Sequence, residues 1–108
     1  MDRKITETLK DFKGALETLG IRVNRIIVFG SYAKGEAKKH SDIDVIVISH
    51  SFKDMNLFER FEILGLALGK AKIMEPIEPL GYTEEEFLAK GEGTFIGDEV
   101  KTKGIEIK

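Results

Sequence analysis

Apolar residues recur at helical spacing in two parts of the chain. Near the N-terminus they alternate at intervals of four and three residues, which marks one face of a helix; they are Ile5, Leu9, Phe12, Leu16 and Leu19. Gly20 suits the position that follows such a helix. A second stripe predicts another amphipathic helix, which Asp54 or Asn56 could cap and Gly69 could end. It consists of Leu57, Phe61, Leu64 and Leu68, with Phe58 beside it.

Runs of β-branched and apolar residues predict three strands. Residues 25–29 form a short run that is apolar enough to be buried on both faces of a sheet. Residues 42–48 carry the strongest strand pattern in the chain. Residues 72–80 predict a third strand, and Pro76 and Pro79 indicate an edge position or irregular ends because proline cannot donate a ladder hydrogen bond.

Smaller elements are predicted in the last quarter of the chain. Thr83 followed by Glu86 has the capping-box pattern, so a short helix is expected over residues 84–90. Apolar residues within 95–100 could form one or two further helical turns, and residues 105–107 alternate like a terminal edge strand. The whole order of elements predicts an α/β (α+β) fold, a small mixed sheet with helices packed on at least one face.

Length and composition restrict the function classes. A chain of 108 residues and 12.1 kDa is expected to form one domain over residues 1–108. Its 17 basic and 19 acidic residues give a net charge of −2, so direct nucleic-acid binding is not expected. The absence of cysteine excludes disulfides and thiol chemistry. No run approaches the roughly 20 apolar residues of a membrane span, and the first residues lack an apolar signal core, so a cytoplasmic location is expected.

Gly30 and Ser31 directly follow the first predicted strand. Glycine lets the backbone turn sharply and approach a ligand, and a helix that begins there would offer free N–H groups to a phosphate. Lys34 makes the same loop basic and could contact a triphosphate, while Tyr32 either stacks on a base or packs against the sheet. The alternative is an ordinary turn with a solvated basic loop.

Asp42 and Asp44 open a strand that is otherwise apolar. Alternation places both carboxylates on one face, roughly 6–7 Å apart, with Ile46 continuing that face. Two like charges there are costly unless a cation compensates them, and hard oxygen ligands suit Mg²⁺. The alternative is a solvated pair at the start of a strand. If strands 25–29 and 42–48 are neighbours, the glycine turn and the carboxylates meet and form a site for a magnesium-bound triphosphate.

Two segments also carry a family resemblance. Residues 30–37 (GSYAKGEA) and 41–45 (SDIDV) resemble the signature of the DNA-polymerase-β-like nucleotidyltransferases, and more closely that of the minimal nucleotidyltransferases of prokaryotes. The resemblance extends over most of the chain. It implies a fold like the polymerase-β palm and the transfer of a nucleoside monophosphate from an NTP.

The resemblance also implies roles for individual residues. Gly30 and Ser31 would hold the β- and γ-phosphates, and Asp42 and Asp44 would ligate two Mg²⁺ ions. A third carboxylate, on the next strand, would bind one metal and help to activate the attacking hydroxyl. Glu78 matches that position, with Glu75 as the alternative. The family usually has Asp there, and in this chain Pro79 follows Glu78 directly.

Three functions fit the resemblance. The first is transfer of a nucleotide, expected to be AMP from ATP, to a partner protein such as the helical HEPN toxins that minimal nucleotidyltransferases often accompany as antitoxins. The second is the same chemistry on a small hydroxylated molecule in a pocket formed by a homodimer. The third is a non-catalytic module that binds a nucleotide or a partner. An α-labelled NTP separates the first two by which molecule acquires the label.

Overall fold

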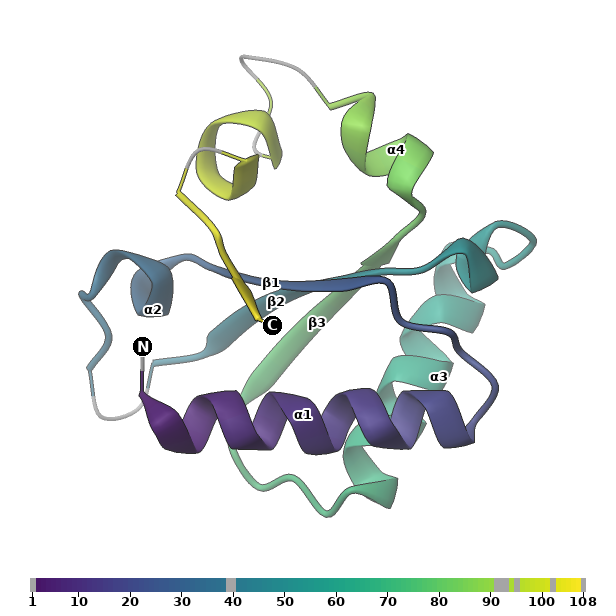
Figure 1. The fold of residues 1–108 in the computed structure, drawn as a ribbon, viewed down its shortest axis with the longest axis horizontal. Coiled ribbons are helices and arrows are strands. Elements are labelled where there is room, and N and C mark those ends of the chain that lie inside the picture. The colour runs from purple at the N-terminus through teal and green to yellow at the C-terminus, as the bar shows by residue number, and fades with distance from the viewer. Residues whose placement is uncertain (1, 39–40, 91–93, 95, 102, 108) are drawn as a thin grey trace.

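A four-stranded sheet lies between two layers of helix (Figure 1). The computed structural model describes residues 2–38, 41–90, 94, 96–101 and 103–107. The elements, in chain order, are α1 (Arg3–Thr18), β1 (Arg25–Phe29), α2 (Ser31–Lys34), β2 (Ile43–Ile48), the 3₁₀ turn η1 (His50–Phe52), α3 (Leu57–Lys70), β3 (Ile77–Tyr82), α4 (Glu84–Leu88), the π-helical turn η2 (Ile96–Lys101) and β4 (Ile105–Ile107). The predicted fold class, a mixed sheet with helices packed on it, is confirmed.

The strands follow the order β3-β2-β1-β4. β1 pairs antiparallel with both β2 and β4, whereas β2 and β3 run parallel. The predicted neighbours, strands 25–29 and 42–48, are therefore adjacent. The third strand lies at an edge, one of the two alternatives that its prolines indicated, but it begins at Ile77 rather than near residue 72 because the chain turns at residues 71–72, where Lys72 has φ of 54°.

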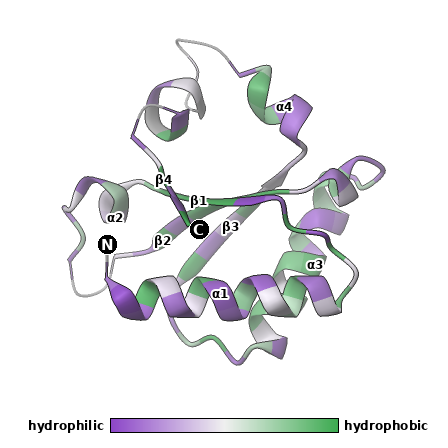
Figure 2. Ribbon diagram, viewed as in Figure 1, coloured by the Kyte–Doolittle hydropathy of each residue, from purple (hydrophilic) through white to green (hydrophobic). Residues whose placement is uncertain are grey.

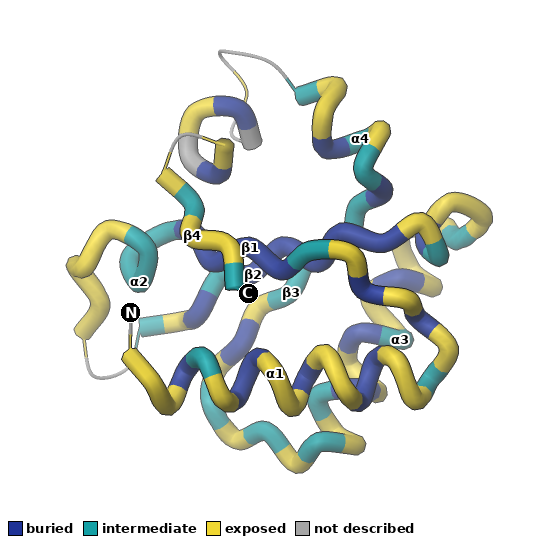
Figure 3. The backbone as a smooth tube through the Cα atoms, viewed as in Figure 1, coloured by how far each residue is buried: buried dark blue, intermediate teal, exposed yellow. Residues whose placement is uncertain are grey.

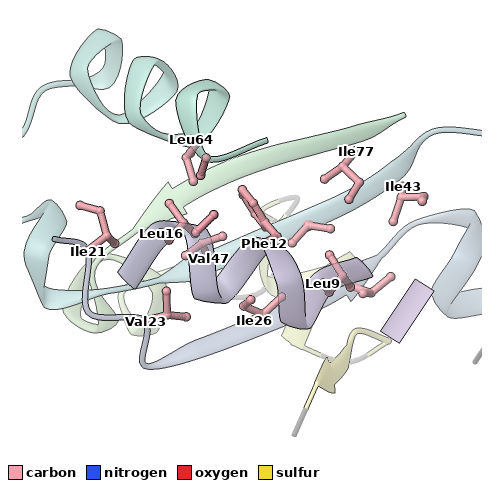
Figure 4. Close-up of a cluster of buried hydrophobic side chains, with 14 of the residues drawn as sticks. Leu9, Phe12, Leu16, Ile21, Val23, Ile26, Ile43, Val47, Leu64 and Ile77 are labelled. Carbon is pink, nitrogen blue, oxygen red and sulfur yellow. The ribbon is translucent and has the colours of Figure 1, made fainter. Parts of the chain in front are cut away.

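Hydrophobic side chains are buried on both faces of the sheet. Ile43, Val45 and Val47 face α1 and α3, where they pack with residues such as Phe12 and Leu64 (Figure 4). Ile46 and Ile48 of β2 belong to a second cluster, formed with α4 and η2; its buried members are Ile27, Phe29, Ile46, Ile48, Phe87 and Val100. β1 and β2 are accordingly almost wholly buried (Figure 3). Burying one such side chain contributes about 1.5–3 kcal/mol, so both layers hold the sheet.

Helix boundaries follow local capping. Gly20, with φ of 93°, ends α1 as expected, and Asn56 rather than Asp54 caps α3 in a capping box with Glu59. The capping box at Thr83 starts α4, which ends at Leu88, somewhat earlier than predicted. The π-helical turn η2 matches the turns expected around Val100, although Phe95 lies outside the described residues. Hydrophobic and hydrophilic residues alternate along α1 and α3 (Figure 2).

The predicted apolar stripe of α3 is only half buried. Leu64 is fully buried, but Leu57 and Phe61 are 62% and 45% exposed. Arg60 instead takes a buried position on the side of α3 that contacts the sheet, where only 9% of the residue is exposed. No helix in the described part of the chain is long and apolar enough to cross a membrane.

Arg60 can be buried because all three nitrogens of its guanidinium group donate hydrogen bonds to protein acceptors. Its Nε donates to the carbonyl of Met55, Nη2 to that of Phe52 and Nη1 to that of Gly81, at 2.7–3.1 Å. Both terminal nitrogens also bond the carboxylate of Glu86 at 2.7 and 3.1 Å. The side chain therefore ties η1, α3, β3 and α4 together.

This network predicts a stability change at acidic pH. The hydrogen bond from Arg60 holds the pKa of Glu86 below its usual value. A carboxyl with a lowered folded pKa stabilises the fold above its unfolded pKa, and this contribution disappears as pH falls through the folded pKa. Glu86→Gln keeps a capping-box residue but removes the charge, so it should cost about 1 kcal/mol at pH 7 and less as the pH falls through the lowered folded pKa of Glu86.

Urea unfolding of the wild type and of Glu86→Gln, at pH 7 and at successively more acidic pH, measures the effect. The exposed Glu85→Gln on the same helix is the matched control. Equal losses for Glu86→Gln at neutral and acidic pH, or equal losses for the two variants, would contradict the pairing.

Candidate active site

One end of the sheet gathers the predicted site residues. β1 ends there at Phe29, and the chain turns at Gly30 into α2, while β2 and β3 begin at the same end (Figure 1). The register places Asp44 of β2 across from Phe29 on one side and Glu78 of β3 on the other. The glycine turn and the carboxylates therefore meet, as the sequence predicts for neighbouring strands.

Gly30 lies against the carboxylate of Asp44. Its backbone has φ of 72° and ψ of −149°, a conformation that is essentially restricted to glycine. A Cβ at this position would lie 2.5 Å from Oδ2 of Asp44 and 3.4 Å from its Cγ. The glycine thus serves the chain reversal and also leaves the space that the carboxylate fills.

The helix that follows Gly30 is a single turn. Gly30 is its N-cap and Gly35, in the left-handed conformation, its C-cap. Ser31 is half-buried at the first position, and Lys34 is exposed at the last. The first N–H groups of a helix have no partner within it, so this turn can offer them to an anion. Tyr32 packs against the main hydrophobic cluster, in agreement with the packing alternative.

The carboxylates of Asp42, Asp44 and Glu78 influence one another. Partial burial, and then the charge of Asp42, raises the pKa of Asp44, while a hydrogen bond with Glu78 opposes this shift. The charge of Asp42, followed by desolvation and the charge of Asp44, raises the pKa of Glu78. Asp42 is exposed and immediately precedes β2 rather than lying within it. The three groups form a local concentration of negative charge.

This concentration suits a divalent cation, although the present side-chain arrangement is not a finished metal centre. Among the described residues, no three histidine or carboxylate side chains are placed as a metal-binding group. Asp42 and Glu78 are exposed. Carboxylate oxygens are the ligands that Mg²⁺ prefers, and a cation would favour the charged forms of the two carboxyl groups, which burial and neighbouring charges disfavour. The residues present therefore fit such an ion.

Glu75 lies elsewhere. It precedes β3, and its carboxylate is 3.8 Å from Nζ of Lys4 on α1. Glu78, by contrast, is the register partner of Asp44. Of the two candidates for a third carboxylate, the fold brings Glu78 to the aspartates.

A cavity of about 400 Å³ adjoins the carboxylates. Its wall is largely apolar, and its lining residues are Phe29, Asp44, Phe61, Ile77, Glu78, Pro79 and Leu80. The sequence did not identify this wall, because Phe61 and Leu80 carry the same apolar signal as core residues. A cavity of similar volume, about 390 Å³, borders Asn24, His50 and Thr83 at the far end of the strands, away from the carboxylates.

Comparison with known proteins agrees with this architecture. Residues 9–100 match the family model of the nucleotidyltransferase domain. The chain belongs to this family. A Methanocaldococcus jannaschii protein named "putative protein adenylyltransferase" is 34% identical over 107 residues, which cover 96% of this chain and 99% of that protein. The predicted enzyme class, a nucleotidyltransferase, is thereby confirmed.

Two solved structures share the fold. The crystal structure of a "putative nucleotidyltransferase" from Sulfolobus solfataricus has a TM-score of 0.67 at 19% identity, covering 95% of this chain and 78% of its own. A toxin–antitoxin crystal structure with AMP-PNP has a TM-score of 0.62 at 18% identity, covering 92% of this chain and 71% of its own. The expected nucleotidyltransferase fold is confirmed.

The contact between Gly30 and Asp44 predicts that two glycines with the same φ respond differently to alanine. Gly30 and Gly35 both have φ of 72°, but an added Cβ meets open space only at Gly35. Gly35→Ala should cost about 1 kcal/mol of stability, from strain alone. Gly30→Ala should cost more, about 2–3 kcal/mol, because its φ/ψ region is less accessible and the Cβ displaces Asp44.

Urea unfolding measures the two stabilities, and calorimetry measures Mg·ATP binding. Gly30→Ala should weaken that binding at least about tenfold, whereas Gly35→Ala should leave it within about threefold. Equal losses at the two glycines would contradict the coupling of the turn to Asp44.

Proposed function

We propose that this protein transfers AMP from ATP to a hydroxyl group of a partner protein in a Mg²⁺-dependent reaction. The observation that carries the proposal is the strand register, which places the Gly30 turn, Asp44 and Glu78 side by side. Because ATP is available in the cytoplasm, we assign the reaction to that compartment.

Each part of the site has a role in this reaction. The N–H groups at the start of α2 and the hydroxyl of Ser31 hold the β- and γ-phosphates, and Lys34, one turn further, contacts the same triphosphate. Asp42, Asp44 and Glu78 would hold two Mg²⁺ ions. The ions would supply charge stabilisation to the attacking and leaving oxygens.

The bond changes are those of an in-line displacement. The acceptor oxygen forms a bond with the α-phosphorus, the bond from this phosphorus to the bridging oxygen breaks, and pyrophosphate leaves. The proton of the hydroxyl passes to a carboxylate, for which the candidate is Glu78, the residue that the family resemblance assigns to activating the attacking hydroxyl. The chain contributes mainly positioning and electrostatics.

A protein acceptor is supported by similarity to named proteins. The relative that this chain matches over almost its full length is named a protein adenylyltransferase, and one structural neighbour is a toxin–antitoxin pair with AMP-PNP. Together with the resemblance to minimal nucleotidyltransferases, this favours an antitoxin role opposite a helical HEPN toxin. The cavity beside Asp44 and Glu78 favours a second candidate, a small hydroxylated acceptor held by a homodimer.

Replacing both aspartates tests the nucleotide site. Asp42→Asn/Asp44→Asn should lower the affinity for Mg·ATP at least about tenfold in calorimetry. The variant should remain folded and become somewhat more stable without metal, because two adjacent charges, one of them partly buried, are removed. The exposed Asp54→Asn is the matched control. Wild-type affinity in the double variant would end the two-metal proposal.

Neutralising the third carboxylate tests turnover separately from binding. With α-labelled ATP, Glu78→Gln should reduce label transfer at least about a hundredfold while Mg·ATP affinity changes less than about tenfold. The matched control is Glu75→Gln, which removes the charge that contacts Lys4. This variant should transfer label as fast as the wild type. Unchanged cellular function of Glu78→Gln would favour the non-catalytic module. Label that appears only in a small molecule would favour the second candidate.

A further inference from the structure

The N-terminal half of α3 exposes three large apolar side chains. Phe58 is 85% exposed, Leu57 62% and Phe61 45%. We call these three residues the α3 patch. Isolated exposed apolar residues are common, but large adjacent ones mark interaction surfaces. The buried side of α3 is occupied by Arg60, Leu64 and Ala67, so the patch does not serve the core.

The patch continues along an unobstructed helix face. Phe58, Phe61 and Gly65 follow the spacing of one helix side, and Gly69 lies one turn beyond Gly65. A Cβ at Gly65 or Gly69 would meet no heavy atom within 4 Å. A partner can therefore approach the backbone of α3 closely while it covers the two phenylalanines.

The patch also reaches the candidate active site. Phe61 lines the cavity of about 400 Å³ that Asp44 and Glu78 border. A molecule that covers Phe58 and Phe61 thus lies beside the carboxylates.

The exposed charged residues within 54–62, the segment that carries the patch, are acidic. Asp54, Glu59 and Glu62 are exposed next to it along the chain. The one basic residue within 54–62, Arg60, is buried against Glu86. Such surroundings complement an apolar surface flanked by lysine or arginine. A second copy fits less well, because both copies would bring these acidic residues to the contact and residues 54–62 offer no exposed basic residue to pair with them.

We propose that the α3 patch docks the protein that receives the nucleotide, through an amphipathic helix whose apolar face is flanked by basic residues. The assignment of this partner as the acceptor rests on the proposed function. The docking surface itself rests on the exposure, the glycine face and the charges of α3.

Two synthetic amphipathic helices, each about five turns long, are suitable probes. Both carry leucine on one face; one has lysine on the other face, and its counterpart has glutamate. The fluorescein-labelled leucine–lysine helix should bind the wild type, with affinity measured by anisotropy. The leucine–glutamate helix should bind at least about tenfold more weakly.

Surface variants locate the binding. Leu57→Ser/Phe58→Ser should weaken the leucine–lysine helix at least about tenfold, and circular dichroism checks its fold. Met74→Ser, at a residue 90% exposed outside the patch, is the matched control and should bind like the wild type. No binding to the wild type, equal affinity of the two peptides, or equal affinity of the two variants would overturn the proposal. So would a wild-type dimer, seen in sedimentation, that the double variant dissociates.

Mg·ATP calorimetry on the same proteins separates this proposal from the proposed function. The double variant should bind Mg·ATP like the wild type, since neither residue lies among the proposed nucleotide or metal ligands. Peptide results as expected with no Mg·ATP binding in any protein would refute the proposed function and leave the docking surface standing. Mg·ATP binding without peptide binding would refute the docking surface and leave the proposed function standing.

Discussion

The register of β2 between β1 and β3 is the constraint on which the site depends. Asp44 lies opposite Phe29 and Glu78 only in this alignment. Because side chains alternate along a strand, a slip of one residue would turn Asp44 into the core beneath α1 and α3. The apolar residues of β2 prevent such a slip: Val45 and Val47 are buried on one face, and Ile46 and Ile48 on the other. Hydrophobic burial on both faces therefore fixes the positions of carboxylates that would otherwise repel one another.

The turn at Gly30 couples the two halves of the site. Its positive φ reverses the chain after β1, and the missing side chain leaves room for the Asp44 carboxylate. The start of α2 and the carboxylate face are consequently held at a fixed separation. A nucleotide bound at this turn would have its phosphates beside the acidic groups without a large movement of the backbone. A glycine at position 30 is therefore required for a steric reason, the space that Asp44 fills, as well as for a chemical one, the approach of a phosphate.

Local patterns predicted much of this arrangement, because they report local physics. The spacing of Leu9, Phe12 and Leu16 defined α1, and the capping residues located the starts of α3 and α4. Asp42 and Asp44 were identified because carboxylates are unusual at the start of an apolar strand. The features that the sequence did not predict depend on tertiary neighbours. Hydrophobicity alone could not show that Arg60 would be buried by four sets of acceptors and that Leu57 and Phe61 would be left outside. Nor could it choose between Glu75 and Glu78, since that choice follows from the pairing of β3 with β2.

The N-terminal half of α3 exposes apolar side chains because other residues of the helix make its contacts with the core. The fully buried Leu64 and Ala67, together with Arg60, satisfy the contacts of α3 with the sheet and its neighbours. Phe58 and Phe61 then have no neighbouring element to cover them in the described part of the chain. Exposing two phenylalanines carries an aggregation risk, and a binding role is the physical reason to retain them. Glu78, on the edge strand β3, lines the same cavity as Phe61. The uncovered helix face and the acidic end of the sheet thus form one continuous surface, on which docking of a partner and presentation of its hydroxyl can occur together.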